Sequence, residues 1–162
     1  MEHIFPDQTL AAYYSYGIET GLLADEQAKV WAFRMISERS EPSYEIIEIA
    51  CAKNRRLLLD WLTQAQGQRQ SNASDAGRCL LTNILVKLRT DPDYDVRDAL
   101  SQAIKIAKAA QMPENIYDML SLIDDSLFLL EDCGYGTMKE ISRDLQDILE
   151  NEGRRLPDNS LS

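Results

Sequence analysis

Four aspartates within eight residues are the densest group of side chains in this sequence that could do chemistry. They lie in RTDPDYDVRDAL, the stretch from Arg89 to Leu100. Alternating carboxylates are typical of a calcium-binding EF-hand loop, which also requires glycine at position 6 and glutamate at position 12. Counted from Asp91, these two positions hold Val96 and Gln102, so the tight turn and the bidentate ligand are both missing. We therefore expect no metal at this stretch.

The same stretch fits the start of a helix. Asp91 is predicted to be the N-cap and Pro92 the first helical residue, because proline is favoured at that position. Asp93 and Asp95 would then lie in the first turn, near the positive end of the helix dipole. This interpretation explains the carboxylates without a ligand.

Side chains suited to catalysis are scarce elsewhere. The only histidine is His3, which argues against histidine triads and histidine-rich metal sites. Adjacent acids at residues 124–125 and 131–132 lack the Glu-x-x-His motifs of a di-metal carboxylate site. Two interpretations of Asp124 and Asp125 stay open: a buried acid of raised pKa, or a pair with one member facing water. We predict no catalytic residue, no cofactor and no metal.

The charge of the chain limits its partners. Its 162 residues include 27 acidic and 17 basic side chains, which gives a formal net charge of −10. Such a surface repels phosphate groups, which argues against binding nucleic acid or an anionic membrane. It favours a basic partner protein, although the same charge also serves solubility. No stretch reaches the roughly 18 apolar residues needed to span a bilayer.

Three cysteines, Cys51, Cys79 and Cys133, are widely separated and show no CxxC spacing. Their odd number, and the absence of a basic and apolar leader at the start, favour a reducing cytoplasmic location. Because each has apolar neighbours, we predict that they are small core residues.

Helical spacing of apolar residues dominates the chain, and no stretch alternates apolar and polar residues as a strand does. We predict an all-α protein, a compact array of about eight helices in antiparallel hairpins. The predicted helices start near residues 8, 25, 42, 55, 74, 92, 113 and 137.

Two of these helices carry predictions about burial. In the helix at 25–38, Val30, Phe33 and Ile36 are predicted to form the inner face. The helix that starts at Pro113 is apolar over most of its surface, which is typical of a central helix covered on several sides.

The chain is predicted to fold as one helical domain, 1–152, followed by a flexible tail, 153–162. The segment Gly67–Gly77 is polar, rich in small residues and the clearest linker. A subdivision near 67–74 therefore stays open.

The acidic stretch has a counterpart fifty residues earlier. SEPSYEIIEIA, residues 40–50, aligns with TDPDYDVRDAL, residues 90–100, with the same proline at the third position and the same tyrosine at the fifth. Each copy follows an amphipathic helix and is predicted to form the turn of a helix hairpin. The copies indicate an internal duplication, or convergence on the same capping chemistry.

The second copy is part of LLTNILVKLRTDPDYDVRDALSQAI, residues 80–104, which resembles a HEAT repeat. It has a leucine-rich first helix, an Asp-Pro turn, then Val-Arg and an alanine-rich second helix. The resemblance implies that Val96 packs between helices and that Arg97 lies in a polar ladder between repeats. The earlier copy departs from this pattern, with Ile47 in place of the arginine.

Residues 21–50, GLLADEQAKVWAFRMISERSEPSYEIIEIA, carry a second resemblance. They have a Gly-Leu-Leu start, a Trp-Ala on the helix and a proline turn before an isoleucine-rich helix. In this they resemble small acidic helical immunity proteins of bacteria. The resemblance implies a non-catalytic inhibitor whose acidic face occludes the basic cleft of a toxin such as a nuclease, with opposite charges speeding association.

The residues predicted to bind the partner are Asp91, Asp93, Tyr94, Asp95 and, within CGYGT, Tyr135. Tyrosine beside carboxylates is common in protein interfaces, although such rings also cover helix ends with the hydroxyl in water. The expected partner is another protein with a basic surface, and the oligomeric state stays open. The alternatives are a HEAT-like adaptor or regulatory subunit and an enzyme that uses carboxylates and a metal.

Overall fold

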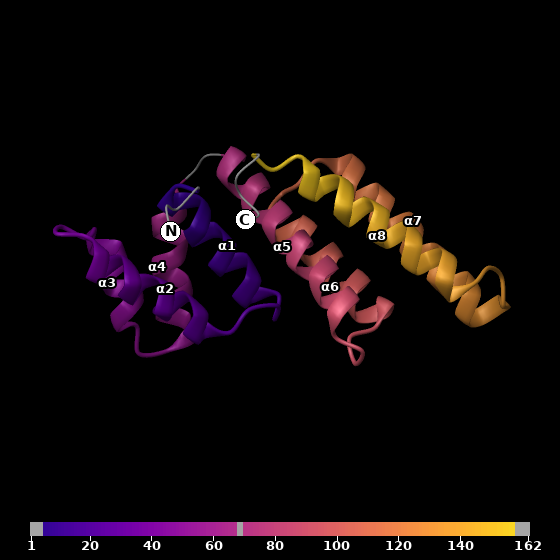
Figure 1. The fold of residues 1–162 in the computed structure, drawn as a ribbon, viewed down its shortest axis with the longest axis horizontal. Helices are drawn as coiled ribbons and strands as arrows, with labels where there is room; N and C mark the ends of the chain where they lie inside the picture. The colour runs from indigo at the N-terminus through magenta and orange to yellow at the C-terminus, as the bar shows by residue number, and fades with distance from the viewer. Residues whose placement is uncertain (1–4, 68–69, 158–162) are drawn as a thin grey trace. The chain divides into compact units, whose positions relative to one another are not determined.

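The computed structural model describes residues 5–67 and 70–157, so His3 lies outside the described residues. These residues form eight α-helices and no strand, which confirms the predicted all-α class (Figure 1). The helices are α1 (Asp7–Glu19), α2 (Asp25–Glu38), α3 (Tyr44–Cys51), α4 (Arg55–Gln66), α5 (Gln70–Thr90), α6 (Val96–Ala109), α7 (Glu114–Cys133) and α8 (Met138–Arg154). Within the same ranges, no helix combines the length and the apolar character that crossing a bilayer requires.

The chain divides into two compact units, Met1–Ala76 and Gly77–Ser162, and the boundary falls inside α5. The prediction of a linker at 67–77 is therefore wrong from residue 70 onward, where the chain is helical. Asn72 is buried in the first unit, and its Oδ1 accepts a hydrogen bond from the Thr9 hydroxyl at 3.2 Å. Small polar residues that suggest a loop in sequence form a helix here because one side of that helix is buried.

In the first unit, α1 packs against α4, α2 against α3, and α3 against α4. Trp31 of α2 is 1% exposed and stacks on Tyr14 of α1, with ring centroids 5.2 Å apart. This contact joins α1 and α2 in the core of the unit.

The inner face of α2 differs from the prediction. Val30 and Phe33 are 66% and 56% exposed, so the predicted inner face is wrong. The buried residues are Ala28, Trp31, Ala32 and Met35, which repeat at i, i+3, i+4 and i+7. The buried side thus includes two alanines, and the larger Val30 and Phe33 lie on the exposed side.

In the second unit, α7 packs against α6 and α8, and α6 also contacts α8. Helix α8 buries Ile141, Leu145 and Leu149 at i, i+4 and i+8. Each of these side chains contributes roughly 1.5–3 kcal/mol through the apolar surface that it removes from water. The start of α8 agrees with the prediction, because Thr137 Oγ1 accepts a hydrogen bond from the Glu140 N–H at 3.2 Å.

Helix α6 begins four residues later than predicted. Its N-cap is Asp95, whose Oδ1 accepts a hydrogen bond from the Asp98 N–H at 2.9 Å, so Val96 is the first helical residue instead of Pro92. The prediction of Asp91 as the N-cap is wrong, because two aspartates in this stretch suit that role and local preference alone does not choose between them.

Asp91 closes a tight turn before the helix. Its Oδ1 accepts a hydrogen bond from the Asp93 N–H at 3.0 Å, and its carbonyl accepts one from the Tyr94 N–H at 3.2 Å. The turn carries Tyr94 inward, where it is 8% exposed. Because the ring of Tyr94 is buried, the chain keeps the turn conformation up to Asp95, the N-cap of α6.

The two copies of the repeated stretch fold differently. Ser43 caps α3, so this helix begins at Tyr44, two residues earlier in the aligned copies than α6 does. As a consequence Tyr44 is 64% exposed and meets Trp61 edge to face at 5.4 Å, whereas Tyr94 is buried. The matched tyrosines therefore have different structural roles.

The predicted tail begins too early. Gly153 is buried, and a Cβ at this position would lie 3.0 Å from the Thr82 hydroxyl. Leu156 is 6% exposed, so the chain is still packed at this residue. Residues 158–162, the remainder of the predicted tail, lie outside the described residues.

Candidate protein-binding surface

The acidic turn, residues 91–95, holds four of the five residues predicted to bind a partner. Asp91 and Asp95 both use their carboxylates to accept backbone hydrogen bonds, and Asp95 Oδ2 also lies 3.8 Å from Arg97 Nη1. Asp93 is exposed, and in the described part of the chain its carboxylate has no hydrogen bond or ion pair. Of the three carboxylates, that of Asp93 alone is not used by the fold.

Tyr94 anchors this turn to the helices on either side. Its hydroxyl donates a hydrogen bond to Gln102 Oε1 of α6, and Lys87 Nζ of α5 lies 4.3 Å from the centroid of its ring. Burial, followed by the nearby Asp98 and Asp95 carboxylates, raises the pKa of Tyr94 to about 12. The ring therefore serves the fold, since only 8% of Tyr94 is exposed.

Helix α7 has a side that the fold does not use. Its buried side consists of Ile116, Leu120, Ile123 and Leu127. The prediction that this helix is central and covered on several sides is wrong, because α6 and α8 cover one side of it. Large apolar side chains therefore remain exposed: Met119 at 37%, Leu122 at 65%, Phe128 at 61% and Leu129 at 46%.

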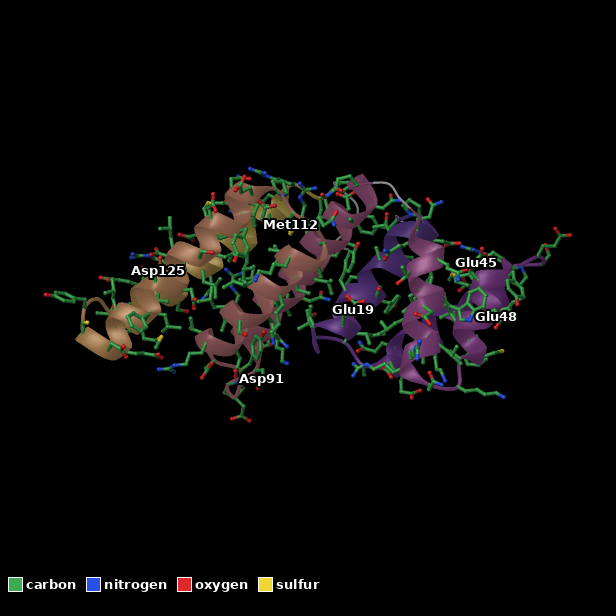
Figure 2. The ribbon with its side chains drawn as sticks, turned by 180° about the vertical axis from the view of Figure 1, so that it is seen from behind. Glu19, Glu45, Glu48, Asp91, Met112 and Asp125 are labelled. Atoms are coloured by element: carbon green, nitrogen blue, oxygen red, sulfur yellow. The ribbon has the colours of Figure 1, made fainter. Side chains whose placement is uncertain are left out.

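The charges of α7 are all of one sign. Its six charged residues are Glu114, Asp118, Asp124, Asp125, Glu131 and Asp132. Glu131 pairs with Arg97 of α6; the other five are exposed and have no ion pair within residues 5–67 and 70–157. Figure 2 labels Asp125 on α7 and Asp91 at the acidic turn. Because Asp124 and Asp125 are both exposed, the interpretation of one of them as a buried acid is wrong.

A groove lies where α7 ends and α8 begins. Gly134, with φ of 70°, ends α7, and Tyr135 follows it with 72% of its surface exposed. Leu129, Tyr135 and Ile141 line the groove together with Glu140 and Asp144, and its volume is about 240 Å³. The structure thus places Tyr135 beside α7 and α8, whereas no residue of the acidic turn lines this groove.

Two basic residues of α8 line a different groove. Lys139 and Arg143 share it with Arg89 of α5, and its volume is about 360 Å³. The two grooves along α8 therefore differ in charge: the one beside α7 is lined by two carboxylates and no base, and the other by three cations and one carboxylate, that of Asp147.

Two of the three cysteines differ from the prediction. Cys51 and Cys133 are exposed, so their assignment to the core is wrong.

In the ranges that the structure describes, no three side chains of the His, Cys, Asp and Glu types gather closely enough to hold a metal ion.

The residues predicted to bind a partner did not include Leu122, Leu129, Glu140 or Asp144. The sequence did contain a signal for them, because a helix that is largely apolar and carries acids without a single base is unsuited to a covered central position.

No protein-family model, curated protein or solved structure matches this chain. Function is therefore inferred from its own side chains.

Proposed function

We propose that this chain is a non-catalytic protein-binding module that covers a basic surface of another protein, as an immunity or inhibitor protein does. The observation that carries the proposal is α7, which combines six carboxylates, no basic residue and exposed large apolar side chains. Exposed apolar surface bordered by polar residues often marks an interaction site. The surrounding carboxylates favour a partner of positive charge.

A toxin that acts on nucleic acid fits this description of the partner. Binding to the phosphate backbone requires a basic surface, and an acidic protein that covers it would exclude the substrate. The net charge of −10 would also speed the encounter with such a partner. The resemblance of residues 21–50 to bacterial immunity proteins supports a toxin as the partner. With it we propose that this chain is located in the cytoplasm.

The acidic turn contributes less to the proposed surface than α7 does. Asp93 is its available carboxylate, whereas Asp91 and Asp95 already hold the backbone. Asp93 would attract a basic partner at long range. Its main effect would be on the rate of association, as is usual for exposed charges. That the turn binds a partner stays a prediction.

The test is capture of a partner by the wild-type chain and by an Asp124→Lys, Asp125→Lys variant, immobilised side by side. Proteins released by salt from the wild type are identified, purified and measured for binding and for their own activity. We expect a basic protein that binds the variant about ten-fold more weakly, because two attractive charges become repulsive. For an inhibitor, one equivalent of the wild type abolishes the partner's activity. Two outcomes would count against the proposal: equal affinity of the partner for the wild type and for the double lysine variant, or a partner whose contact surface is acidic.

The second candidate is a HEAT-like adaptor or regulatory subunit. It is supported by the packing of successive helices on one another, α2 on α3 and α3 on α4 in the first unit, α6 on α7 and α7 on α8 in the second. The same capture separates the two candidates, because an adaptor would leave its partner's activity intact and bind a further component.

A further inference from the structure

We infer that the outer face of α7 and the adjoining groove bind a single amphipathic helix of the partner, with apolar residues along one side and lysine or arginine along its edges. This inference rests on the proposed function and names the chemistry that this surface recognises. By the outer face we mean the exposed residues Met119, Leu122, Ser126 and Leu129. The groove is the one lined by Leu129, Tyr135, Ile141, Glu140 and Asp144.

The apolar part of the surface has the geometry of a helix-binding site. Met119, Leu122, Ser126 and Leu129 repeat at i, i+3, i+7 and i+10, so they share one side of α7. This row is roughly 15 Å long, which matches about three turns of a second helix laid along it. Amphipathic helices bind such surfaces through apolar residues spaced at i, i+3, i+4 and i+7.

The groove extends this row at the end of α7. Leu129 belongs to both, and Tyr135 supplies an exposed aromatic ring on the far side of Gly134. The volume of about 240 Å³ is below the ~300–1,000 Å³ usual for small-molecule pockets. A large apolar side chain at the end of a docked helix is a better match to this space than a free ligand is.

Carboxylates border the apolar row on both sides. Asp118 and Asp125 lie one helical turn before Leu122 and Leu129, respectively, at i−4 spacing. Across the groove, Glu140 and Asp144 occupy one side of α8, also four residues apart. Asp144 Oδ1 lies 3.8 Å from Arg143 Nε, so its charge is partly compensated. Neither α7 nor the lining of the groove contains a basic residue, and the other three carboxylates of the border remain available to attract cations.

The same charges argue against a second copy of this chain as the occupant. A symmetric pairing through α7 would bring identical carboxylates together, and like charges that face each other across an interface oppose association. A basic amphipathic helix instead places its apolar side on the row and its cations along the border.

The probe for this inference is a synthetic, fluorescently labelled helix of about 18 residues, with leucine on one side and lysine elsewhere. One control peptide has the same composition in an order that spreads leucine around the helix, and a second replaces lysine with glutamate. Binding is measured by fluorescence anisotropy at about 50 mM and about 300 mM salt. We expect the amphipathic lysine peptide to bind, the two controls to bind at least about ten-fold more weakly, and the affinity to fall with salt.

Substitutions on the protein locate the site. Leu122→Ala combined with Leu129→Ala is expected to weaken binding of the probe roughly ten-fold or more, because the row loses both of its leucine side chains. The matched control is Leu57→Ala in α4, a leucine that is 41% exposed in the other unit, and it should change the affinity less than about two-fold. Both variants alter exposed side chains, so both proteins are expected to fold.

The native cysteines provide an independent readout. Cys133 is exposed four residues after Leu129, and Cys51 is exposed in the first unit. The bound probe should slow alkylation of Cys133 and leave the alkylation rate of Cys51 unchanged. Equal rates at Cys133 with and without a saturating probe would place the probe elsewhere and overturn the inference.

Two further outcomes would overturn it. One is binding of the amphipathic and scrambled lysine peptides with equal affinity, since this would indicate attraction to charge without an apolar site. The other is a captured partner whose binding is lost with the Asp124→Lys, Asp125→Lys variant but unchanged with the double leucine variant. That second result would keep the proposed function and reject the α7 row as the docking site.

Discussion

The acidic turn and α7 carry the same kind of side chain, but the fold uses them differently. In the turn, two carboxylates hold backbone N–H groups, and Tyr94 is buried between α5 and α6. On α7, five of six carboxylates have no ion pair in the described ranges, and exposed leucines lie beside them. A binding surface is therefore indicated less by a concentration of charge than by charges and apolar side chains that the fold leaves unused.

The largest effect expected from this comparison lies within α7 itself. Leu127 is 7% exposed and Leu122 is 65% exposed on the same helix. Leu127→Ala should lower the free energy of unfolding by about 2–5 kcal/mol, because it leaves a cavity in the core. Leu122→Ala should change it by no more than about 0.5 kcal/mol. Urea denaturation of the two variants measures both values, and similar losses would show that α7 is packed on both sides.

A smaller effect separates the carboxylates of the two regions. Asp95→Ala removes the N-cap of α6 and should lower the free energy of unfolding by about 1 kcal/mol. The matched change on α7, Asp125→Ala, should leave stability the same or slightly higher, since alanine favours the helix and no hydrogen bond is lost. Chemical denaturation near neutral pH gives the comparison. An equal loss in both variants would contradict the different roles assigned to them.

The pH dependence of stability tests the anchoring of the turn. The pKa of Tyr94 is about 12 in the folded protein and about 10 when unfolded, so the folded state holds this proton more tightly. Its contribution is complete below pH 10 and is lost as the pH rises toward 12. Tyr94→Phe should therefore show a smaller fall in stability than the wild type between about pH 9 and about pH 11.

Other tyrosines do not disturb this comparison. Burial raises the pKa of Tyr14 and of Tyr16 as well, but both are present in the wild type and in the variant. The difference between the two stability curves thus reports on Tyr94. Parallel curves would mean that its hydroxyl is not protected in the folded protein.

The smallest effect is expected at Asp93. Asp93→Asn removes an exposed charge that the fold does not use, so the free energy of unfolding should change by less than about 0.5 kcal/mol. A loss comparable with that of Asp95→Ala in the same denaturation experiment would show that all three carboxylates of the turn are structural.

Local chemistry in the sequence was sufficient to locate most of the helices. A helix was predicted to start near residue 55, and α4 begins there because Asn54 Oδ1 accepts a hydrogen bond from the Leu57 N–H at 2.9 Å. At the other end of a helix, Gly134 ends α7 with a positive φ, a conformation that glycine favours. These features depend on a few neighbouring residues, which is why capping and turn preferences are enough to predict them.

Features that depend on the other helices were not predictable in this way. Which side of α2 is buried depends on how closely its neighbours approach, and Ala28 and Ala32 were less conspicuous than Val30 and Phe33. Whether an apolar helix such as α7 is covered depends on how many helices the unit supplies for it. The start of α6 depends on where Tyr94 is buried, and the residues around the turn permit either of two caps.

The position of the unit boundary inside α5 has a practical consequence for dissecting the protein. A fragment that stops at Ala76 retains seven residues of this helix, Gln70 to Ala76, far fewer than the roughly 12–15 that make an isolated helix even marginally stable in water. The complementary fragment loses the turns that precede Leu80 and Leu81. Expression plasmids for the separate halves should therefore both encode the whole of α5, with Gln70–Thr90 duplicated between them.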